Sequence, residues 1–164
     1  MEYLDVVDED DALVGKDTRE NVHCKGLIHR TVMFFIFNLE DKVFVNQRAK
    51  DKEFFGGYHS IVLGGHVVSG QTYDEAVRRE AYEEAKMTSE PFYMGSIKKR
   101  LAEESENVAV YGFKTEKEPH LDESEVIWGE FMDLNQLREY MRSHRFLPET
   151  KDLLPILEKY YKRL

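Results

Sequence analysis

The sequence has little of several features that would place it in a broad class of proteins. Cys24 is the only cysteine among 164 residues, so no disulfide can form within the chain, and this composition fits a reducing compartment. The longest apolar run, Val32 to Phe37, is far shorter than the roughly 20 residues that a membrane-spanning helix needs. The first residues contain neither a basic segment followed by an apolar stretch nor a small-residue cleavage site. We therefore expect a cytoplasmic protein that does not enter a membrane.

Positive charge is also scarce. The chain has 23 Lys and Arg residues against 32 Asp and Glu residues, which gives a formal net charge of −9. Such a chain has no overall field to attract nucleic acid or an anionic membrane surface, and we expect neither as a partner. If it binds phosphates, it needs local cations or metal ions.

The chain does have the size and composition of one globular domain. With 41% apolar residues, ten Phe and nine Tyr, 164 residues can bury a core without disulfides or a structural metal. No internal repeat, low-complexity tract or linker divides the chain, so we expect a single domain over residues 1–164. The sequence does not decide the oligomeric state, and a homodimer is compatible with it.

Strand patterns dominate the first two thirds of the chain. Two short strands around an acidic turn, within about residues 3–16, predict a hairpin. Apolar or Val- and Phe-rich segments predict further strands at 30–38, 43–47, 61–63, 92–101, 107–114 and 126–132. Helical spacing predicts helices at about 134–142 and 149–161. The sequence therefore predicts an α/β (α+β) fold in which helices cover two faces of a mixed sheet.

The glutamates of one predicted helix carry the strongest functional signal. Thr72 and Glu75 have the spacing of a capping box, which predicts a helix from about 73 to about 86. At about 100° per residue, the carboxylates of Glu80, Glu83 and Glu84 converge on one helix face. Like charges at this spacing repel, and a bound divalent cation would reverse that penalty. Three oxygen ligands on one face suit a hard cation such as Mg²⁺ or Mn²⁺.

An acidic helix face is more often simply solvated, and Arg79 has the spacing to neutralise part of the charge. The loop predicted before the helix favours a metal site instead. Gly64, Gly65 and Gly70 permit a close approach of the backbone to a ligand. Loop and helix together predict a metal and phosphate site, in which we include Gly64 with the three glutamates as metal-binding positions.

The same segment resembles the signature of the Nudix hydrolases. That signature is Gly, five residues, Glu, seven residues, then Arg-Glu-apolar-x-Glu-Glu-x-Gly-apolar. The chain fits it at Gly65, Arg79, Glu80, Glu83, Glu84 and Met87, with Ala81 as a weak match, Gln71 in place of the first glutamate and Lys86 in place of the last glycine.

The resemblance implies a Nudix-like α/β/α sandwich with a mixed sheet, whose signature loop and helix span residues 65–87. It further implies that Glu80, Glu83 and Glu84 hold Mg²⁺ or Mn²⁺. Among these residues, Glu80 and Glu83 are the predicted catalytic glutamates, and Arg79 would orient the carboxylates.

Residues 3 to 133 are also similar to the branch of this superfamily that contains isopentenyl diphosphate isomerase and its nucleotide-hydrolysing relatives. The matching segments are Lys25 to Arg30, the Phe-rich strand ending at Asn38, Asn46 to Ala49 with Lys52, and Gly65-His66. In the isomerase, matching histidines bind a divalent metal, which implies metal-binding roles here for His23, His29 and His66, with Glu104 or Glu106 as carboxylate ligands. The predicted contacts to a small-molecule diphosphate substrate are Arg48, Lys52, Gly65 and Gln71.

Three functions follow from this resemblance. The first is a divalent-metal-dependent hydrolase that cleaves a pyrophosphate linkage in a nucleoside diphosphate derivative or a related organic diphosphate. The second is an isopentenyl diphosphate isomerase-like protein. However, Gly64 replaces the catalytic cysteine of the isomerase, and the position of its catalytic glutamate falls on either Glu106 or Asn107. Proton transfer at carbon needs an acid and a base, so hydrolysis is favoured. The third is a catalytically weak nucleotide-binding module, in which the substitutions at Gln71 and Lys86 have removed catalysis, since neutral Gln71 is a poorer metal ligand than glutamate.

Overall fold

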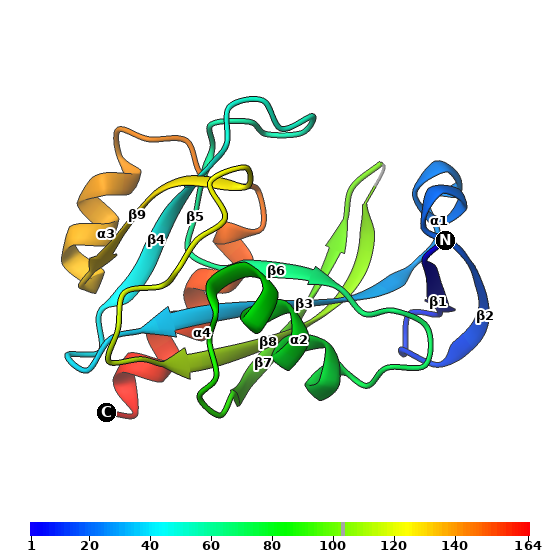
Figure 1. The fold of residues 1–164 in the computed structure, drawn as a ribbon, viewed down its shortest axis with the longest axis horizontal. Coiled ribbons are helices and arrows are strands. Elements are labelled where there is room, and N and C mark those ends of the chain that lie inside the picture. Colours follow the sequence, from blue (N-terminus) through cyan, green and yellow to red (C-terminus); the bar gives the residue numbers. More distant parts are fainter. Residues whose placement is uncertain (103) are drawn as a thin grey trace.

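The computed structural model describes residues 1–102 and 104–164, which form one curled sheet with helices packed against it (Figure 1). The strands are β1 (Tyr3–Val7), β2 (Leu13–Thr18), β3 (His29–Phe37), β4 (Val43–Arg48), β5 (His59–Ser60), β6 (Leu63–His66), β7 (Phe92–Arg100), β8 (Ser105–Lys114) and β9 (Val126–Met132). The helices are α1 (Arg19–Lys25), α2 (Tyr73–Ala85), α3 (Leu134–Met141) and α4 (Thr150–Lys162). Among the described residues, none of the helices has the length and apolar character needed to cross a membrane.

Strand β3 connects the parts of the sheet. It pairs in parallel with β8 from His29 to Phe37, and antiparallel with β6 from Thr31 to Phe34. Outside these pairs, β7 lies antiparallel to β8, β9 and β5 pair with β4, and β2 forms a hairpin with β1. The sheet thus contains both parallel and antiparallel neighbours, which confirms the predicted mixed sheet.

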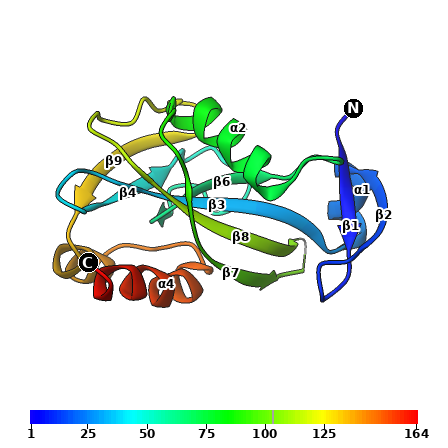
Figure 2. The same cartoon turned by 90° about the horizontal axis from the view of Figure 1, so that it is seen from below.

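The apolar run of β3 is continuous because both faces of this strand are buried. Val32, Phe34 and Ile36 pack in a core cluster with Ala76, Val77 and Ala81 of α2. The alternate residues of β3 pack in a second cluster with Leu137 of α3 and with Leu153 and Leu157 of α4. Figure 2 shows α2 on one side of the sheet and α4 on the other, so the predicted α/β/α sandwich is confirmed.

Two local expectations were wrong. The run 61–63 does not form a strand of its own: Ile61 and Val62 are buried between β5 and β6, and the Gly64-Gly65 pair belongs to β6 rather than to a loop. These glycines are held in strand geometry because β6 pairs with Met33 and Val32 of β3. In addition, no sequence pattern indicated α1, which has only seven residues between its N-cap Thr18 and the left-handed Gly26.

Helix α2 runs over Tyr73–Ala85 and has both hydrogen bonds of the Thr72–Glu75 capping box, so this expected start is confirmed. The helix ends at Lys86, whose backbone is left-handed with φ 56° and ψ 29°. Non-glycine residues in this conformation carry a steric cost of about 1 kcal/mol. The signature of the Nudix family has glycine at this position, and here the chain instead holds lysine under strain.

We expect Lys86→Gly to stabilise the protein by about 1 kcal/mol, because glycine adopts the left-handed conformation without steric cost. Urea unfolding at an unchanged m-value measures this difference. Lys86→Ala is the matched control, since it also removes the side chain but keeps the β-carbon and should give no such gain. Equal free energies of unfolding for the two variants would show that Lys86 is not strained.

Candidate functional site

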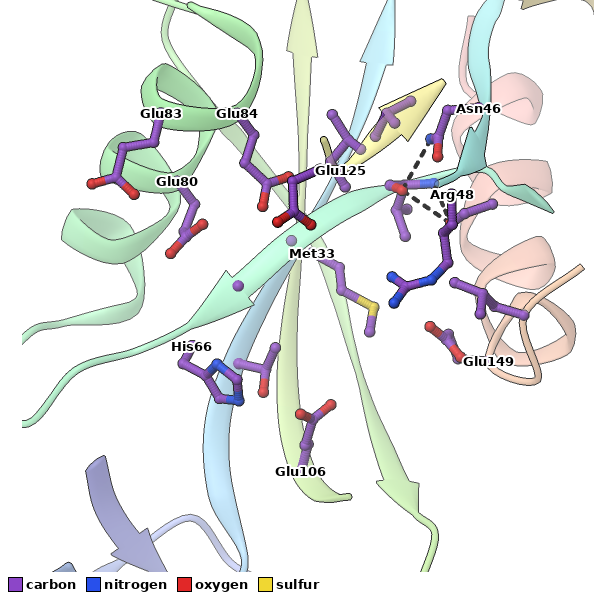
Figure 3. A pocket seen from close by; sticks show the side chains of 18 of the residues that line it. Met33, Asn46, Arg48, His66, Glu80, Glu83, Glu84, Glu106, Glu125 and Glu149 are labelled. Atoms are coloured by element: carbon purple, nitrogen blue, oxygen red, sulfur yellow. Dashed lines mark hydrogen bonds between the residues drawn. The ribbon is translucent and has the colours of Figure 1, made fainter. Parts of the chain in front are cut away.

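A pocket of about 580 Å³ lies where β6 meets the end of β4, the end of α2 and the segments before β9 and α4 (Figure 3). Strand β6 runs through its middle. The α2 glutamates lie on one side of this strand in the close-up, and the side chains of Arg48 and Glu149 lie on the other. The pocket thus brings together residues from across the whole sequence.

The three signature glutamates all line this pocket. Figure 3 shows Glu80 and Glu84 pointing from α2 toward β6, while Glu83 lies on the outer side of Glu80. Burial raises the pKa of the Glu84 carboxyl to about 8, and the neighbouring Glu80 adds to this effect. Burial likewise raises the pKa of Glu80, although Arg79 opposes the shift. The protein therefore gathers carboxylates where their charge is unfavourable, which is the situation that a bound dication relieves.

Gly65 makes room for one of these carboxylates. A β-carbon at position 65 would overlap the carboxylate of Glu80, so any side chain there would displace it. This close approach of helix and strand gives a physical reason for the glycine that opens the signature. Gly65 also lines the pocket, where it was expected to contact substrate.

Arg79 ties the end of β6 to α2. Its Nη1 donates to Glu80 Oε1 at 2.8 Å and to Glu83 Oε2 at 3.3 Å, while its Nη2 donates to the carbonyl of His66 at 2.9 Å. The same Nη2 donates to Gln71 Oε1 at 3.2 Å. Arg79 is therefore placed to orient the glutamates. Gln71 is not among the described residues that line the pocket, and its amide contacts Arg79.

The three histidines singled out in the sequence meet on the other side of β6. His23, His29 and His66 each offer a ring nitrogen, and these atoms all lie within 4.8 Å of one another. Nε2 of His23 is 3.1 Å from Nε2 of His66. Burial lowers the pKa of His66 to about 3, so its imidazole is neutral at physiological pH, the form that binds metal ions.

His29 has the hydrogen-bonding arrangement typical of a metal ligand. Its Nδ1 lies 3.0 Å from the carbonyl of Leu27, which can only accept, so Nδ1 carries a proton. Its Nε2 faces Glu106 Oε2 at 3.3 Å. In a neutral ring that carries its proton on Nδ1, Nε2 is an acceptor, so it faces the carboxylate oxygen with no hydrogen between them. A second proton or a bound cation between the two atoms would remove this unfavourable contact.

The carboxylates predicted beside these histidines surround one lysine. Lys99 Nζ is 2.5 Å from Glu104 Oε2 and 4.0 Å from Glu106 Oε1. Burial disfavours the charge of Glu106, but the His29 ring and Lys99 outweigh it and lower the pKa of this carboxyl to about 2. Glu106 therefore stays ionised beside the histidines.

The strand register separates Glu106 from Asn107. Glu106 pairs with His29 across β8 and β3, and its side chain lines the pocket. Asn107 points to the opposite side, where its Nδ2 donates to Asp11 and its Oδ1 accepts from Arg100. Alternate residues of a strand face opposite sides of the sheet, so Glu106 rather than Asn107 occupies the pocket side.

The two basic residues expected to contact phosphate both line the pocket. Arg48 is the last residue of β4, and its Nη2 donates to the carbonyl of Phe54 at 3.2 Å. Lys52 forms an ion pair with Glu125 from the segment before β9. Figure 3 shows Glu125 beside Glu84, so this ion pair lies next to the α2 glutamates.

No sequence pattern indicated that Lys99, Glu125 and Glu149 line the pocket, although all three do. Each comes from a segment distant from the signature, and none stands in a local motif. Lys99 alternates with exposed neighbours along β7, a pattern that could have placed it on one face, though not in this pocket.

The raised pKa of Glu84 makes stability depend on pH. Between about pH 4.5 and 8 the folded protein keeps a proton that the unfolded chain releases, so this group weakens the fold as pH rises. Glu84→Gln does not titrate. In EDTA, the melting temperature of this variant should therefore rise relative to that of the unsubstituted protein from pH 5 to pH 8. Thermal unfolding across that range measures the difference, and a pH-independent difference would contradict the assignment.

Comparison with known proteins places this chain in a family. Residues 27–154 match the family model described as the NUDIX domain. An uncharacterised Nudix hydrolase from Streptomyces coelicolor is 31% identical over 151 residues, which cover 90% of this chain and 83% of the relative. An isopentenyl-diphosphate Delta-isomerase from Pectobacterium atrosepticum is 28% identical, over 83% of this chain and 79% of that protein.

Solved structures agree on the fold. The crystal structure of DR0079 from Deinococcus radiodurans superposes with a TM-score of 0.79 at 24% identity, and the match covers 98% of this chain and 99% of that one. With the family match over most of the chain, the conclusion is direct. The protein belongs to the Nudix family and is a Nudix-type hydrolase.

Proposed function

We propose that the protein is a divalent-metal-dependent pyrophosphohydrolase whose substrate is a nucleoside diphosphate derivative or a related organic diphosphate. The observation that supports this most is one pocket lined both by the carboxylates of Glu80, Glu83 and Glu84 and by the cations of Arg48 and Lys52. Carboxylates repel a diphosphate unless a dication lies between them. Basic side chains bind its remaining oxygens directly.

The α2 glutamates fit Mg²⁺ or Mn²⁺ because they offer oxygen atoms in a half-buried cluster that is short of positive charge. Gly64 of β6 also lines the pocket, and its backbone carbonyl is the only metal ligand that it can supply. The cluster of His23, His29 and His66 with Glu106 is a second metal position, and its nitrogen ligands suit Mn²⁺ better than Mg²⁺. Glu104, which pairs with Lys99, is a further candidate carboxylate for this position. A bound metal supplies charge neutralisation of phosphate oxygens and lowers the pKa of a coordinated water.

Side chains of the protein position the carboxylates and the phosphate group. Arg79 holds Glu80 and Glu83 in place through its Nη1 and anchors them to the backbone of His66 through its Nη2. Glu80 and Glu83 are the residues to accept a proton from an attacking water. Lys52 changes partner from Glu125 to a phosphate oxygen, and Arg48 binds a second oxygen.

The position of Gln71 favours a hydrolase over a weak binding module. Glutamine in place of the signature glutamate removes a negative charge beside Arg79, while the carboxylates of Glu80, Glu83 and Glu84 still line the pocket. A neutral amide at position 71 therefore leaves the proposed metal ligands intact.

An isomerase-like function is the second candidate, since the histidine cluster and Glu106 are assembled here and an isomerase is among the relatives. The position of the missing cysteine opposes it. A β-carbon at Gly64 would overlap the carbonyl oxygen of Val32 on the paired strand β3. The backbone therefore leaves no room for a catalytic side chain at this position.

Glu84→Gln should reduce kcat/KM for hydrolysis by about 100-fold or more, because it removes a negative ligand oxygen from the proposed metal site. The measurement is turnover of a panel of nucleoside diphosphate derivatives and isoprenoid diphosphates with Mg²⁺ or Mn²⁺, read by product identity. Asp74→Asn is the control, because Asp74 lies on the same helix and pairs with exposed Arg78. Unchanged turnover in Glu84→Gln, or equal turnover in EDTA, would exclude the proposal.

Gly64→Cys should destabilise the protein by about 1–3 kcal/mol and yield no isomerisation of isopentenyl diphosphate, because the new β-carbon displaces the β3 backbone. Urea unfolding and product analysis measure the two effects. Gly15→Cys is the matched control, since a β-carbon at position 15 meets no atom within 4 Å. A stable Gly64→Cys variant that forms the allylic isomer would favour the isomerase instead.

A further inference from the structure

Glu149 is a buried carboxylate that the proposed chemistry does not use. It lines the pocket just before α4, and only 5% of its surface is exposed. No described residue hydrogen-bonds to its buried Oε2. A carboxylate that is buried in this way is costly unless a partner satisfies it.

The helix beside Glu149 does not explain this burial. Glu149 is the N-cap residue of α4, where an acidic side chain commonly accepts a hydrogen bond from the first backbone N–H groups. Here the side chain makes no such bond. Its carboxylate faces the pocket instead, as Figure 3 shows, at the side of the pocket that lies away from the α2 glutamates.

Lys99 does not fully compensate Glu149 either. Lys99 Nζ is 3.6 Å from Glu149 Oε2, beyond hydrogen-bonding distance, and it is closer to Glu104 at 2.5 Å. Burial opposes the charge of Lys99, but Glu149 and Glu106 raise its pKa, so one ammonium serves three carboxylates. Glu149 therefore retains capacity to accept a hydrogen bond from a molecule in the pocket.

The neighbours of Glu149 indicate which part of a ligand reaches it. Arg48 lies next to it in the close-up, and the α2 glutamates lie across β6. A diphosphate that spans the α2 glutamates and Arg48 would have Glu149 beside its Arg48 end, so a group attached at that end would meet this carboxylate. A carboxylate attracts hydrogen-bond donors there and repels oxygen acceptors.

We propose that Glu149 is a specificity-determining residue, which accepts a hydrogen bond from the organic moiety of the substrate. This inference rests on the proposed function and extends it to the substrate class. The donor is the exocyclic amino group of a nucleobase or a hydroxyl of the sugar. Ligands that present an oxygen at the same point are rejected, because its lone pairs would face the carboxylate.

Matched nucleotides separate the two sources of the donor. Cytidine and uridine diphosphates, and likewise adenosine and inosine diphosphates, differ by an amino group in place of an oxygen. Cytidine and 2′-deoxycytidine diphosphates differ by one sugar hydroxyl. The experiment measures kcat/KM for each with the metal-loaded protein, and dissociation constants by calorimetry, for the unsubstituted chain, Glu149→Gln and the exposed control Glu118→Gln.

In the unsubstituted chain, we expect the donor-bearing member of at least one pair to be preferred. Glu149→Gln should lower that preference by about tenfold, since an amide is a weaker acceptor and itself presents a donor. Glu118→Gln should leave the preference unchanged. Loss of the amino preference identifies a base contact, and loss of the hydroxyl preference identifies a sugar contact.

Three results would overturn the inference: no preference within any pair in the unsubstituted chain, a preference that Glu149→Gln leaves within twofold, or an equal loss in the control variant. Because the amide of Glu149→Gln can still contact the ligand, Glu149→Leu is measured as well. Thermal unfolding shows that each variant is folded.

A different result would contradict the proposed function without contradicting the role of Glu149. If the unsubstituted protein binds these nucleotides without hydrolysing any, the hydrolase assignment to them is wrong. A binding preference that depends on Glu149 would still support the role of Glu149.

Discussion

The structure depends on negative charge that is concentrated in a partly buried pocket. Among the described residues that line it, nine are Asp or Glu and five are Lys or Arg, in a chain whose net charge is already −9. Each buried carboxylate costs free energy unless a cation or a hydrogen-bond donor compensates it. Arg79, Lys52 and Lys99 each compensate some of these carboxylates, and the remaining excess is consistent with the proposed binding of dications and a polar ligand.

The fold holds this charge in place because the surrounding framework is apolar and tightly paired. β3 is buried on both faces and hydrogen-bonded on both edges, which fixes β6 and β8 beside it. The absence of a side chain at Gly65 then leaves room for the carboxylate of Glu80 between β6 and α2. A rigid framework keeps like charges close, and the cost of their repulsion is met by the stability of the core.

Local patterns in the sequence predicted the elements whose signals are local. The capping box fixed the start of α2, and helical spacing placed Glu80, Glu83 and Glu84 on one face. The segment 126–132 coincides with β9, because its apolar and aromatic residues stand between polar segments. Helix α1 was missed because seven residues are too few to show an apolar period.

Features that depend on contacts between distant segments could not be predicted in the same way. A shift of one residue in β8 exchanges Glu106 for Asn107 on the pocket face, and the sequence alone did not fix that register. Glu149 and Lys99 are 50 positions apart, and only the packing of α4 against β7 brings them together. Nothing in the residues around either one indicates this contact.

Gly64 shows how one position can separate two chemistries within a shared pocket. The histidines, Glu106 and the basic residues are those expected for binding a metal and a diphosphate, and all of them remain around β6. Moving a proton on and off carbon requires one more group, and at position 64 the carbonyl of Val32 occupies the space its β-carbon would need. Attack by water on a phosphorus atom requires no side chain there. The pairing of β6 with β3 therefore favours hydrolysis through a steric constraint on the backbone, even though the proposed metal-binding residues alone would allow both reactions.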